Sequence, residues 1–486
     1  MGAEPKAPSV QDRVDDVGGR GGIERHGVDR IPDAERTSSP GTFAMIFIGS
    51  SVGLGAVAFG WIGMGFGLGV WDTIAAIAVG TVVGQLLLVP LILLGSRTAT
   101  NDATASGATF GVRGRLIGSA IGLLSCLFSV ALTTWTSGSA GVAVAGRLLG
   151  TPDTAATQAV AYAVVLAVSA AIAIWGYRWL VRANVVLMTL GGLLLLLMLV
   201  AFGGAIDWGY AGSEPVLGSY LATWLLVATT IGVSGALVVC TIVGDWTRYI
   251  RSDRHSTSSL AWIGSIGVFI GFVVPAAIGA LVSTSSPAFA DPSVPFAATL
   301  ANEAPAWYAV LLLPLGVLGG VGLVASSLYS AGLDLDALVV RLTRPQTTTI
   351  IAVVAVILIY LAVASPNIIE VASAALLVMA ELAAPWAVII GINFLRTGGH
   401  YDPDDLQVFN RRETGGRYWF TGGWNWPATL AWAVGSIAGL LTIQTLSFTG
   451  PFSDIAGGVD ISLLLGAVVA AAIYLPFSGN REVARA

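Results

Sequence analysis

Charged residues are scarce in this chain of 486 residues: Asp, Glu, Lys and Arg make up 10%, against about 25% in an average soluble domain. Hydrophobic residues make up 55%, and the mean hydropathy is +0.82. These values exclude an ordinary soluble domain and predict that the lipid bilayer is the chain's main partner. No basic patch with interleaved aromatic residues is present, so we expect no nucleic-acid partner. Nothing in the sequence indicates an obligate protein partner.

Cysteine and histidine are also rare, with two Cys and three His. Cys126 and Cys240 both fall in apolar segments. Their position excludes a disulfide framework and argues against a metal site. A P-loop motif of the form GxxxxGK[ST] is missing, so an ion gradient rather than ATP is the expected energy source. Residues 1–41 are polar and lack the apolar core of a signal peptide. We expect them to form a cytoplasmic tail that is disordered as far as about Gly22.

Long apolar runs are what the chain does contain. About twelve of them are each near the roughly 20 residues that an α-helix needs to cross a bilayer. We therefore predict an all-α membrane protein with about twelve transmembrane helices. The predicted spans are 42–66, 71–95, 116–148, 155–176, 182–204, 218–244, 258–282, 306–332, 347–364, 370–395, 425–447 and 460–479.

The basic residues are sorted by side. With the N-terminus inside, every one of the 23 Lys and Arg residues except Arg147 falls on the cytoplasmic side of these spans. Short cytoplasmic loops keep Lys and Arg, so this asymmetry fixes the orientation. It predicts a multi-pass protein of the inner or plasma membrane with both termini in the cytoplasm. The loop 396–424 and the C-terminal residues 481–486 fall on the same side.

Spans one and six carry small and hydroxylated residues at mid-depth. Span one contains GSSVGLG at 49–55, and span six contains TTIGVSG at 229–235. Glycine-interrupted helices at matching places in two halves indicate a transporter site at a repeat interface. Close helix packing through small residues is the alternative. We expect a first repeat at 42–204, a second at 218–395, and two extra helices within 425–480.

Six different short motifs follow one another along the chain. They are GVDRIPDAER at 27–36, FGVRG at 110–114, DWTRY at 245–249, LYSAGL at 328–333, APW at 384–386, and GGRYW at 415–419 followed by Asn425. Together they resemble the nucleobase:cation symporter-1 family, particularly its purine–cytosine permease branch. The resemblance implies a leucine-transporter-like fold of five-plus-five inverted repeats, and symport of a planar heterocycle with a cation.

The implied function is import of a cytosine- or purine-class base by alternating access. A vitamin permease of the same family, for thiamine or pyridoxine, is the first alternative. An intramembrane enzyme is disfavoured because no catalytic pair lies at depth, since His26, His255 and His400 are all in connecting segments. A channel is disfavoured because no filter-like loop or Arg-rich voltage sensor is present.

The resemblance also implies positions for substrate contacts on spans one, three, six and eight. The family's stacking aromatic, its amide partner and its second aromatic correspond to Ser129, Thr133 and Ala236, so both aromatic positions depart from the pattern. Trp135 is the expected replacement, with packing as its alternative. Short hydroxyls and exposed backbone would contact the substrate edge. The remaining candidates are Ser50, Ser51, Gly53, Ser234, Gly235, Ser326 and Ser327.

The coupling ion is expected to be H⁺ or Na⁺, with no other cofactor. A sodium site would use the carbonyl groups of Ile48 and Ser51, because an unwound helix exposes oxygen ligands. Glu381, in the middle of span ten, is a candidate for proton coupling. A charged carboxyl at mid-membrane costs free energy, so such residues usually have a functional role. Structural polarity is its alternative. Asp245 and Arg248, at the cytoplasmic end of span six, are candidates for an inner gate or hinge.

Overall fold

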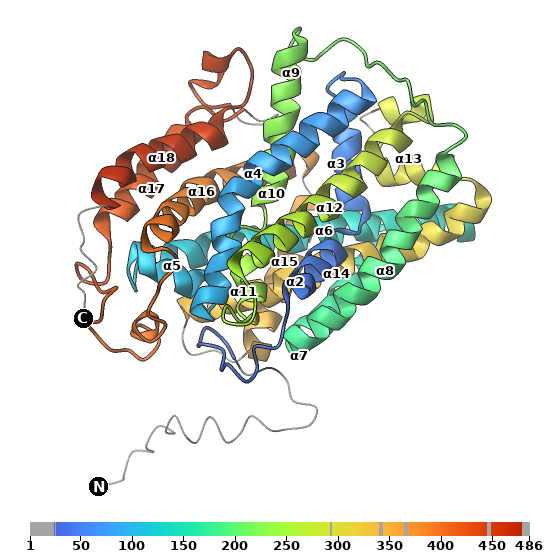
Figure 1. Ribbon diagram of the computed structural model, residues 1–486. Helices are drawn as coiled ribbons and strands as arrows, with labels where there is room; N and C mark the ends of the chain where they lie inside the picture. Colours follow the sequence, from blue (N-terminus) through green and yellow to red (C-terminus); the bar gives the residue numbers. More distant parts are fainter. Residues whose placement is uncertain are drawn as a thin grey trace.

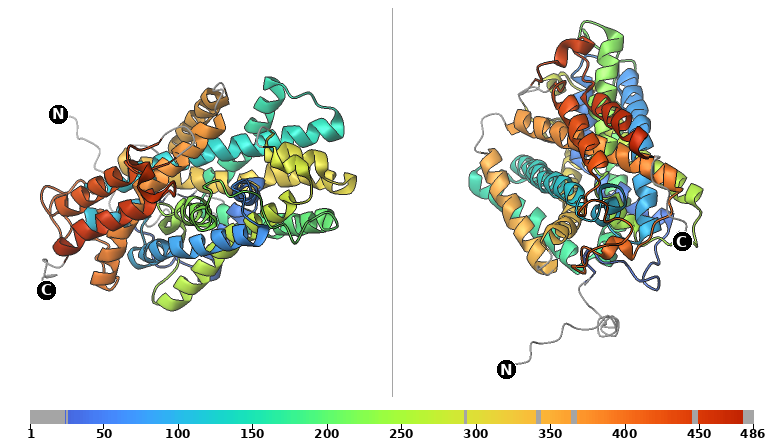
Figure 2. Two further views of the ribbon diagram at one scale, coloured as in Figure 1. Left: turned by 90° about the horizontal axis from the view of Figure 1, so that it is seen from above. Right: turned by 90° about the vertical axis from the view of Figure 1, so that its left-hand side faces the viewer.

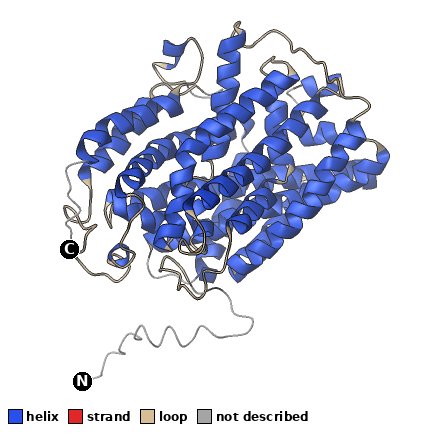
Figure 3. Ribbon diagram, in the orientation of Figure 1, coloured by secondary structure: helices blue, strands red, loops and turns tan. Residues whose placement is uncertain are grey.

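The computed structural model describes Glu24 and residues 26–291, 294–339, 344–363, 368–444 and 449–478. The predicted tail as far as Gly22 and the C-terminal residues 481–486 lie outside the described residues. Within the described residues the regular structure is helical, with no strand longer than an isolated bridge (Figure 3). Eight helices are long and apolar enough to cross a membrane, and one bent helix pair counts as a ninth in this part of the chain.

Every predicted span contains one or more helices. In chain order they are α2 (Pro40–Ser51) with α3 (Leu54–Met64), α4 (Val70–Thr98), α6 (Leu116–Leu149), α7 (Ala155–Trp175), α8 (Tyr177–Phe202), α9 (Tyr220–Val227) with η1 (Ala228–Val233) and α10 (Ser234–Leu237), α12 (Thr257–Ser283), α14 (Ala306–Leu338), α15 (Arg344–Val363), α16 (Ile368–Thr397), α17 (Trp426–Leu440) and α18 (Ser462–Ser478). The connecting helices are α5 (Asp102–Phe110), α11 (Val243–Thr247), η2 (Pro287–Ala290), α13 (Phe296–Glu303), η3 (Asp405–Gln407) and η4 (Ser453–Ala456).

Helix α14 lies at the centre of the bundle, packed against α6, α7 and α8 and against the bent pair α2–α3. Helices α17 and α18 pack on each other and on α16, at one side of the bundle (Figures 1 and 2). We call the end of the bundle that carries residues 26–39, α5 and α11 the inner end, at the bottom of Figure 1. The opposite end is the outer end.

The predicted interruption of span one is confirmed. Helix α2 begins with a capping box at Ser39 and with Pro40 at its first position, and it ends at Ser51. Helix α3 begins after Gly53 at an angle of 67° to α2. Val52 and Gly53 therefore lie outside helical geometry at mid-depth, where backbone groups are freed.

The predicted interruption of span six was placed too early. Residues 228–233 form a π-helix that runs directly into α10, and the helix is lost only at 238–242, before α11. The glycines of span six were misleading because they serve close packing: a methyl group on Gly232 would lie 2.7 Å from the Cα of Gly80 in α4. The next turn packs on α4 as well, since a methyl group on Gly84 would lie 2.8 Å from Ala236 Cβ. The true interruption falls in the run VVCTI, whose β-branched side chains favour the helix weakly.

The outer end is covered by residues 284–291 and 294–305. The Trp61 indole N–H of α3 donates to the Phe289 carbonyl at 2.6 Å, and the ring of Trp61 contacts that of Phe296. Arg147 at the end of α6 donates to the Ala301 carbonyl. This contact gives the one basic residue on the predicted extracellular side a structural role.

Candidate functional site

The interrupted helix α2–α3 meets α14 through glycines. A methyl group on Gly53 would lie 2.6 Å from the Gly319 carbonyl oxygen, and one on Gly319 would lie 2.6 Å from Gly53 Cα. Three residues further along α14, a methyl group on Gly322 would lie 2.7 Å from the Gly49 carbonyl oxygen. We call Gly49, Gly53, Gly319, Gly320 and Gly322 the glycine junction. Backbone approach this close requires glycine on both helices.

Helix α6 reaches the same junction. A methyl group on Gly320 would overlap Ser137 Oγ and would lie 3.5 Å from the Thr133 carbonyl oxygen. The structure thus brings Thr133 and the α2–α3 interruption to adjacent residues of α14. This agrees with the expectation that spans one, three and eight share one site, although neighbouring backbone does not show a substrate contact.

The predicted serines are largely bonded to their own helices. The hydroxyls of Ser50 and Ser51 both donate to the Phe47 carbonyl at 2.9 Å, and Ser234 donates to the Thr230 carbonyl. Such bonds leave each oxygen free to accept one from a ligand. Ser326 and Ser327 are buried in α14, and the Ser326 hydroxyl makes no hydrogen bond in the described structure.

Asn184 of α8 is a polar residue at the junction that the sequence analysis missed. It is fully buried, and its Nδ2 donates to the Leu180 carbonyl at 2.9 Å. Its Oδ1 has no hydrogen-bond partner in the described structure and would lie 3.1 Å from a methyl group on Gly322. The Gly49 carbonyl oxygen and Asn184 Oδ1 therefore both pack against Gly322 of α14. The one side-chain amide in the predicted span 182–204 was the available signal.

Other predicted contacts point elsewhere. Trp135 is half-buried and packs against the main apolar core, and Ser129 is half-buried on α6. Ala236 packs on α4, as described above. Gly235 lies under the ring of Phe272, which itself contacts Phe59 of α3 at 5.5 Å between ring centroids. Phe59 and Phe272 therefore form an aromatic pair that joins α3 to the segment of Gly235.

Glu381 lies away from the glycine junction. Its carboxyl is fully buried, and a methyl group on Gly439 of α17 or on Gly466 of α18 would overlap Oε1. The carboxyl is thus enclosed by α16, α17 and α18, outside the contact between α2, α8 and α14. The structure separates this residue from the other coupling candidates, Ile48 and Ser51, of which Ile48 contacts Gly271 of α12.

The inner end is closed by an arginine of the first sequence motif. Arg36 donates to the backbone carbonyls of Ser96 at 2.5 Å, of Ile250 at 2.7 Å and of Arg248 at 3.0 Å, and to Asp33 at 3.1 Å. Burial lowers the pKa of the Arg36 guanidinium, and the Asp33 carboxylate opposes this shift. One side chain thus joins the end of α4 to the residues after α11.

Arg248 of the DWTRY motif completes this closure, which we call the inner latch (Glu24, Arg36, Arg248, Tyr249 and Tyr329). Its guanidinium donates to the Gly27 carbonyl at 2.7 Å and to the Tyr329 hydroxyl at 2.9 Å, and it pairs with Glu24 at 3.3 Å. Tyr249 also donates to Glu24, at 2.6 Å. Three motifs that are far apart in the sequence therefore meet in one buried network.

Buried carboxyl groups lie beside the latch. Asp102 of α5 accepts from the Gly244 N–H at 2.6 Å, at the start of α11. Burial raises the pKa of Asp102 well above its usual value, and the charge of Asp245 raises it further, while the Gly244 amide opposes the shift. Asp334 of α14 is buried in the same region. The predicted gate pair, Asp245 and Arg248, thus belongs to a larger network.

The FGVRG and GGRYW motifs and Asn425 meet at the same end. Asn425 donates to the Thr109 carbonyl at 2.6 Å, and the Arg113 N–H donates to the Gly423 carbonyl at 2.8 Å. The Arg113 guanidinium lies over the Trp419 ring, 5.1 Å from its centroid. The FGVRG and GGRYW motifs therefore fasten the loop 396–424 to the start of α6.

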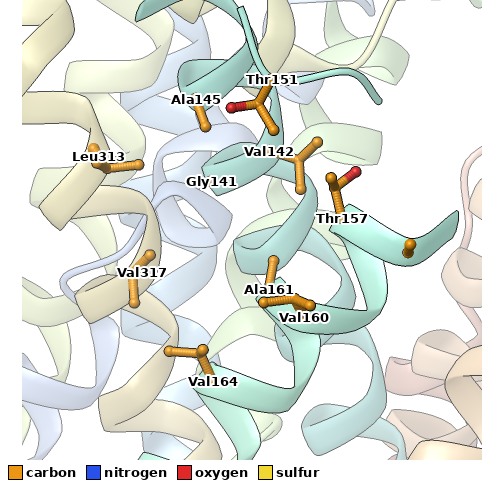
Figure 4. Close-up of a pocket in the computed structure, with 11 residues that line it drawn as sticks. Gly141, Val142, Ala145, Thr151, Thr157, Val160, Ala161, Val164, Leu313 and Val317 are labelled. Carbon is orange, nitrogen blue, oxygen red and sulfur yellow. The ribbon is translucent and has the colours of Figure 1, made fainter. Parts of the chain in front are cut away.

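A cavity of about 390 Å³ lies between α6, α7 and α14 (Figure 4). It contains none of the predicted site residues. Nearly all of its lining is apolar, including Val142, Val160, Val164 and Val317. Such a surface offers no hydrogen-bond donors or acceptors to the polar edge of a heterocycle, so we do not assign it as the substrate site. Among the described residues, no group of three His, Cys, Asp or Glu side chains could hold a metal.

Comparison with known proteins agrees with the motifs. Residues 30–466 match the sequence profile of a family described as permeases for cytosine/purines, uracil, thiamine and allantoin. The Bacillus subtilis (strain 168) protein YxlA, whose assignment as a purine–cytosine permease is itself provisional, is 22% identical over 462 residues. The match covers 93% of this chain and 95% of YxlA.

Solved structures show the same fold. Mhp1, a nucleobase–cation–symport-1 family transporter in a closed conformation with bromovinylhydantoin bound, is 19% identical with a TM-score of 0.71, covering 93% of this chain and 94% of Mhp1. The inward-facing Mhp1 structure gives a TM-score of 0.65 at 22% identity and covers 94% of both chains. A Na⁺-coupled sialic acid symporter gives 0.57 at 12% identity and covers 93% of this chain and 92% of its own. The predicted fold class is confirmed.

Proposed function

Because the chain belongs to the family of permeases for cytosine, purines, uracil, thiamine and allantoin, we propose that it imports a nucleobase-like heterocycle of the cytosine or purine class by cation-coupled symport. The observation that carries the mechanism is the interrupted helix α2–α3, bent by 67° and packed on α14 through glycine. The arginine asymmetry supports a cytoplasmic inner end, with both termini inside. The ranges 42–204 and 218–395 are the proposed repeats, followed by the loop 396–424 and the helices within 425–480.

The substrate would bind beside the interruption of α2–α3, near Thr133 of α6. The Ser51 and Ser234 hydroxyls can accept hydrogen bonds from its edge, because both already donate to backbone carbonyls. Its flat face would pack against Phe59, which is half-buried and held by Phe272. This pair would replace the stacking aromatics that are missing at Ser129 and Ala236.

The coupling cation would bind where Gly49 O and Asn184 Oδ1 face Gly322. Both atoms are oxygens, the ligands that hard cations prefer, and Asn184 Oδ1 has no other partner in the described structure. This donor set supports Na⁺ over H⁺, because neither group titrates. Glu381 is enclosed by its own helix α16 and by α17 and α18, away from these two oxygens, so we assign it no part in coupling.

The inner latch would open and close the cytoplasmic path. Arg248 and Glu24 join residues near α11 to the N-terminal segment, and Tyr329 joins both to α14. Movement of α2–α3 against α14 requires these contacts to part in the inward-open state. Asp245, beside Asp102, lies at the hinge of this movement.

Uptake into proteoliposomes tests the proposal. The panel is radiolabelled cytosine, adenine, hypoxanthine, uracil, allantoin, thiamine and pyridoxine, each under an imposed Na⁺ or H⁺ gradient. We expect accumulation of cytosine or a purine under the Na⁺ gradient. Accumulation of only thiamine or pyridoxine would instead support the vitamin permease alternative, and accumulation of none would contradict the proposed substrate class.

Replacement of Asn184 by alanine is expected to raise the Na⁺ concentration for half-maximal uptake by about tenfold, the equivalent of about 1.4 kcal/mol for one lost ligand. Uptake is measured as a function of Na⁺ at fixed substrate. Gln85→Ala is the matched control. Gln85 of α4 is also a buried amide, but it donates to the Ser265 carbonyl of α12 at 3.1 Å and so joins two helices other than α8 and α14. An unchanged Na⁺ dependence in Asn184→Ala would exclude Asn184 as a ligand.

A further inference from the structure

The Glu381 carboxyl occupies a built site that the transport mechanism does not use. Its side chain is fully buried between α16, α17 and α18. Glycine stands at both facing positions, Gly439 and Gly466, where any side chain would overlap Oε1. The space for this carboxyl is therefore created by two neighbouring helices together.

Further oxygen atoms without partners gather around it. Asp460, just before α18, interacts electrostatically with Glu381, and its Oδ1 accepts from the Ser462 N–H at 2.9 Å. The Ser462 hydroxyl is only 1% exposed and approaches both carboxyls, without a well-formed hydrogen bond to either. In the described structure both oxygens of Glu381, Oδ2 of Asp460 and the Ser462 hydroxyl all lack a hydrogen-bond partner.

Two neutral oxygens extend the set. Ser436 of α17 is 4% exposed, lies three residues before Gly439 and has no partner for its hydroxyl in the described structure. Gln444 follows α17, its backbone N–H approaches Asp460, and its Oε1 is likewise unpartnered there. The donors are carboxylate, hydroxyl and amide oxygens, which is the ligand chemistry of hard cations.

No basic residue of α17, α18 or the segment that joins them balances the two carboxyls, and none of α16 lies near Glu381. The sequence contains no Lys, Arg or His between residues 418 and 480, nor within α16 before Arg396. Arg396 follows Glu381 by fifteen residues, which is about 22 Å along a helix. Two buried carboxylates require compensation by a cation or by protons. We propose that α16, α17 and α18 hold a divalent hard cation of the calcium class, which neutralises both carboxylates.

The site is separate from the proposed coupling site and independent of the substrate. Gln444 lies just after the end of α17 and Asp460 just before the start of α18, at the outer end, so the cation would enter from that side. Its role would be to fasten the α17–α18 pair to α16. Calcium would therefore change stability without driving transport.

Terbium luminescence tests the site in purified full-length protein. Tb³⁺ binds at calcium-type oxygen sites and is excited through a nearby tryptophan. The Trp432 indole N–H donates to the Leu382 carbonyl at 3.0 Å, which places this ring next to Glu381. We expect tryptophan-excited Tb³⁺ emission that CaCl₂ displaces, and Tb³⁺ affinity at least about tenfold weaker in Glu381→Gln and Asp460→Asn. Asp454→Asn, an exposed carboxylate in the same loop, is the matched control and should bind normally.

Thermal unfolding gives a second readout that does not depend on tryptophan. CaCl₂ should raise the unfolding temperature of the wild type and of Trp432→Phe relative to EDTA, because a ligand that binds only the folded state stabilises it. This shift should disappear in Glu381→Gln and in Asp460→Asn. The proposal is overturned if calcium leaves the wild type unchanged, or if emission and shift survive in both carboxylate variants. Neither outcome bears on the transport proposal, since no substrate is present.

Discussion

Replacement of Gly53 by alanine is expected to lower the initial rate of substrate uptake at least tenfold. The new methyl group would lie 2.6 Å from the Gly319 carbonyl oxygen and would force α3 away from α14. Overpacking at a tight contact typically costs about 1–3 kcal/mol, and a backbone carbonyl cannot rotate away as a side chain can. Because alternating access moves these two helices against each other, the cost falls on the conformational cycle. Uptake into proteoliposomes measures it.

Gly55→Ala is the matched control for this prediction. Gly55 lies in the first turn of α3, two residues after Gly53, and a methyl group there would meet no atom within 4 Å. We expect Gly55→Ala to transport at the wild-type rate, with equal amounts of protein in the membrane. If Gly53→Ala transports as well as Gly55→Ala does, close approach at the glycine junction is not required for transport.

Replacement of Arg36 by alanine is expected to abolish measurable uptake and to lower the unfolding temperature. Three backbone carbonyls and the Asp33 carboxylate would lose their donor. Hydrogen bonds to charged groups are each worth about 1.5–3 kcal/mol, and buried carbonyls left without a donor add a desolvation cost. The inner end would then remain open, so substrate could not be released in a coupled cycle. Uptake and thermal unfolding of the purified protein measure the two effects.

Two variants separate the loss of geometry from the loss of charge. Arg36→Lys keeps the charge but not the planar fork that reaches three carbonyls, so we expect most of the loss to persist. Arg30→Ala removes an exposed arginine from the same motif and should have little effect. Normal uptake by Arg36→Ala would show that the inner end can close without this residue.

The sequence motifs predicted the family correctly, and in the structure their side chains contact backbone groups or one another. Arg36 and Arg248 lie 212 residues apart in the sequence, yet the guanidinium of one binds the carbonyl of the other. The order of such motifs along the chain predicted the family, which the sequence profile then confirmed. Their meeting at one end of the bundle could not be read from order alone, because it depends on how the helices connect.

The sequence did not show which way each helix faces. Ala236 stays a predicted substrate position, although the structure packs it beside Gly84, and Glu381 faces two glycines of α17 and α18. Asn184 was overlooked although it lies at the junction. In a helix that is apolar on all sides, the sequence pattern does not show which face packs against the rest of the protein. A single polar residue therefore does not indicate which helix its side chain faces.

The sequence by itself determined the apolar spans, the sorting of basic residues that predicts their orientation, the interruption of span one and the family. These properties depend on hydropathy, on the sorting of arginine and on local backbone preference, all of which are carried by residues close together in the chain. Only the tertiary structure decided where span six is interrupted, which face each helix presents, and which polar atoms share a site. Those depend on contacts such as Gly53 with Gly319 and Glu381 with Gly466, in which the fit between two distant surfaces fixes each helix in rotation and depth.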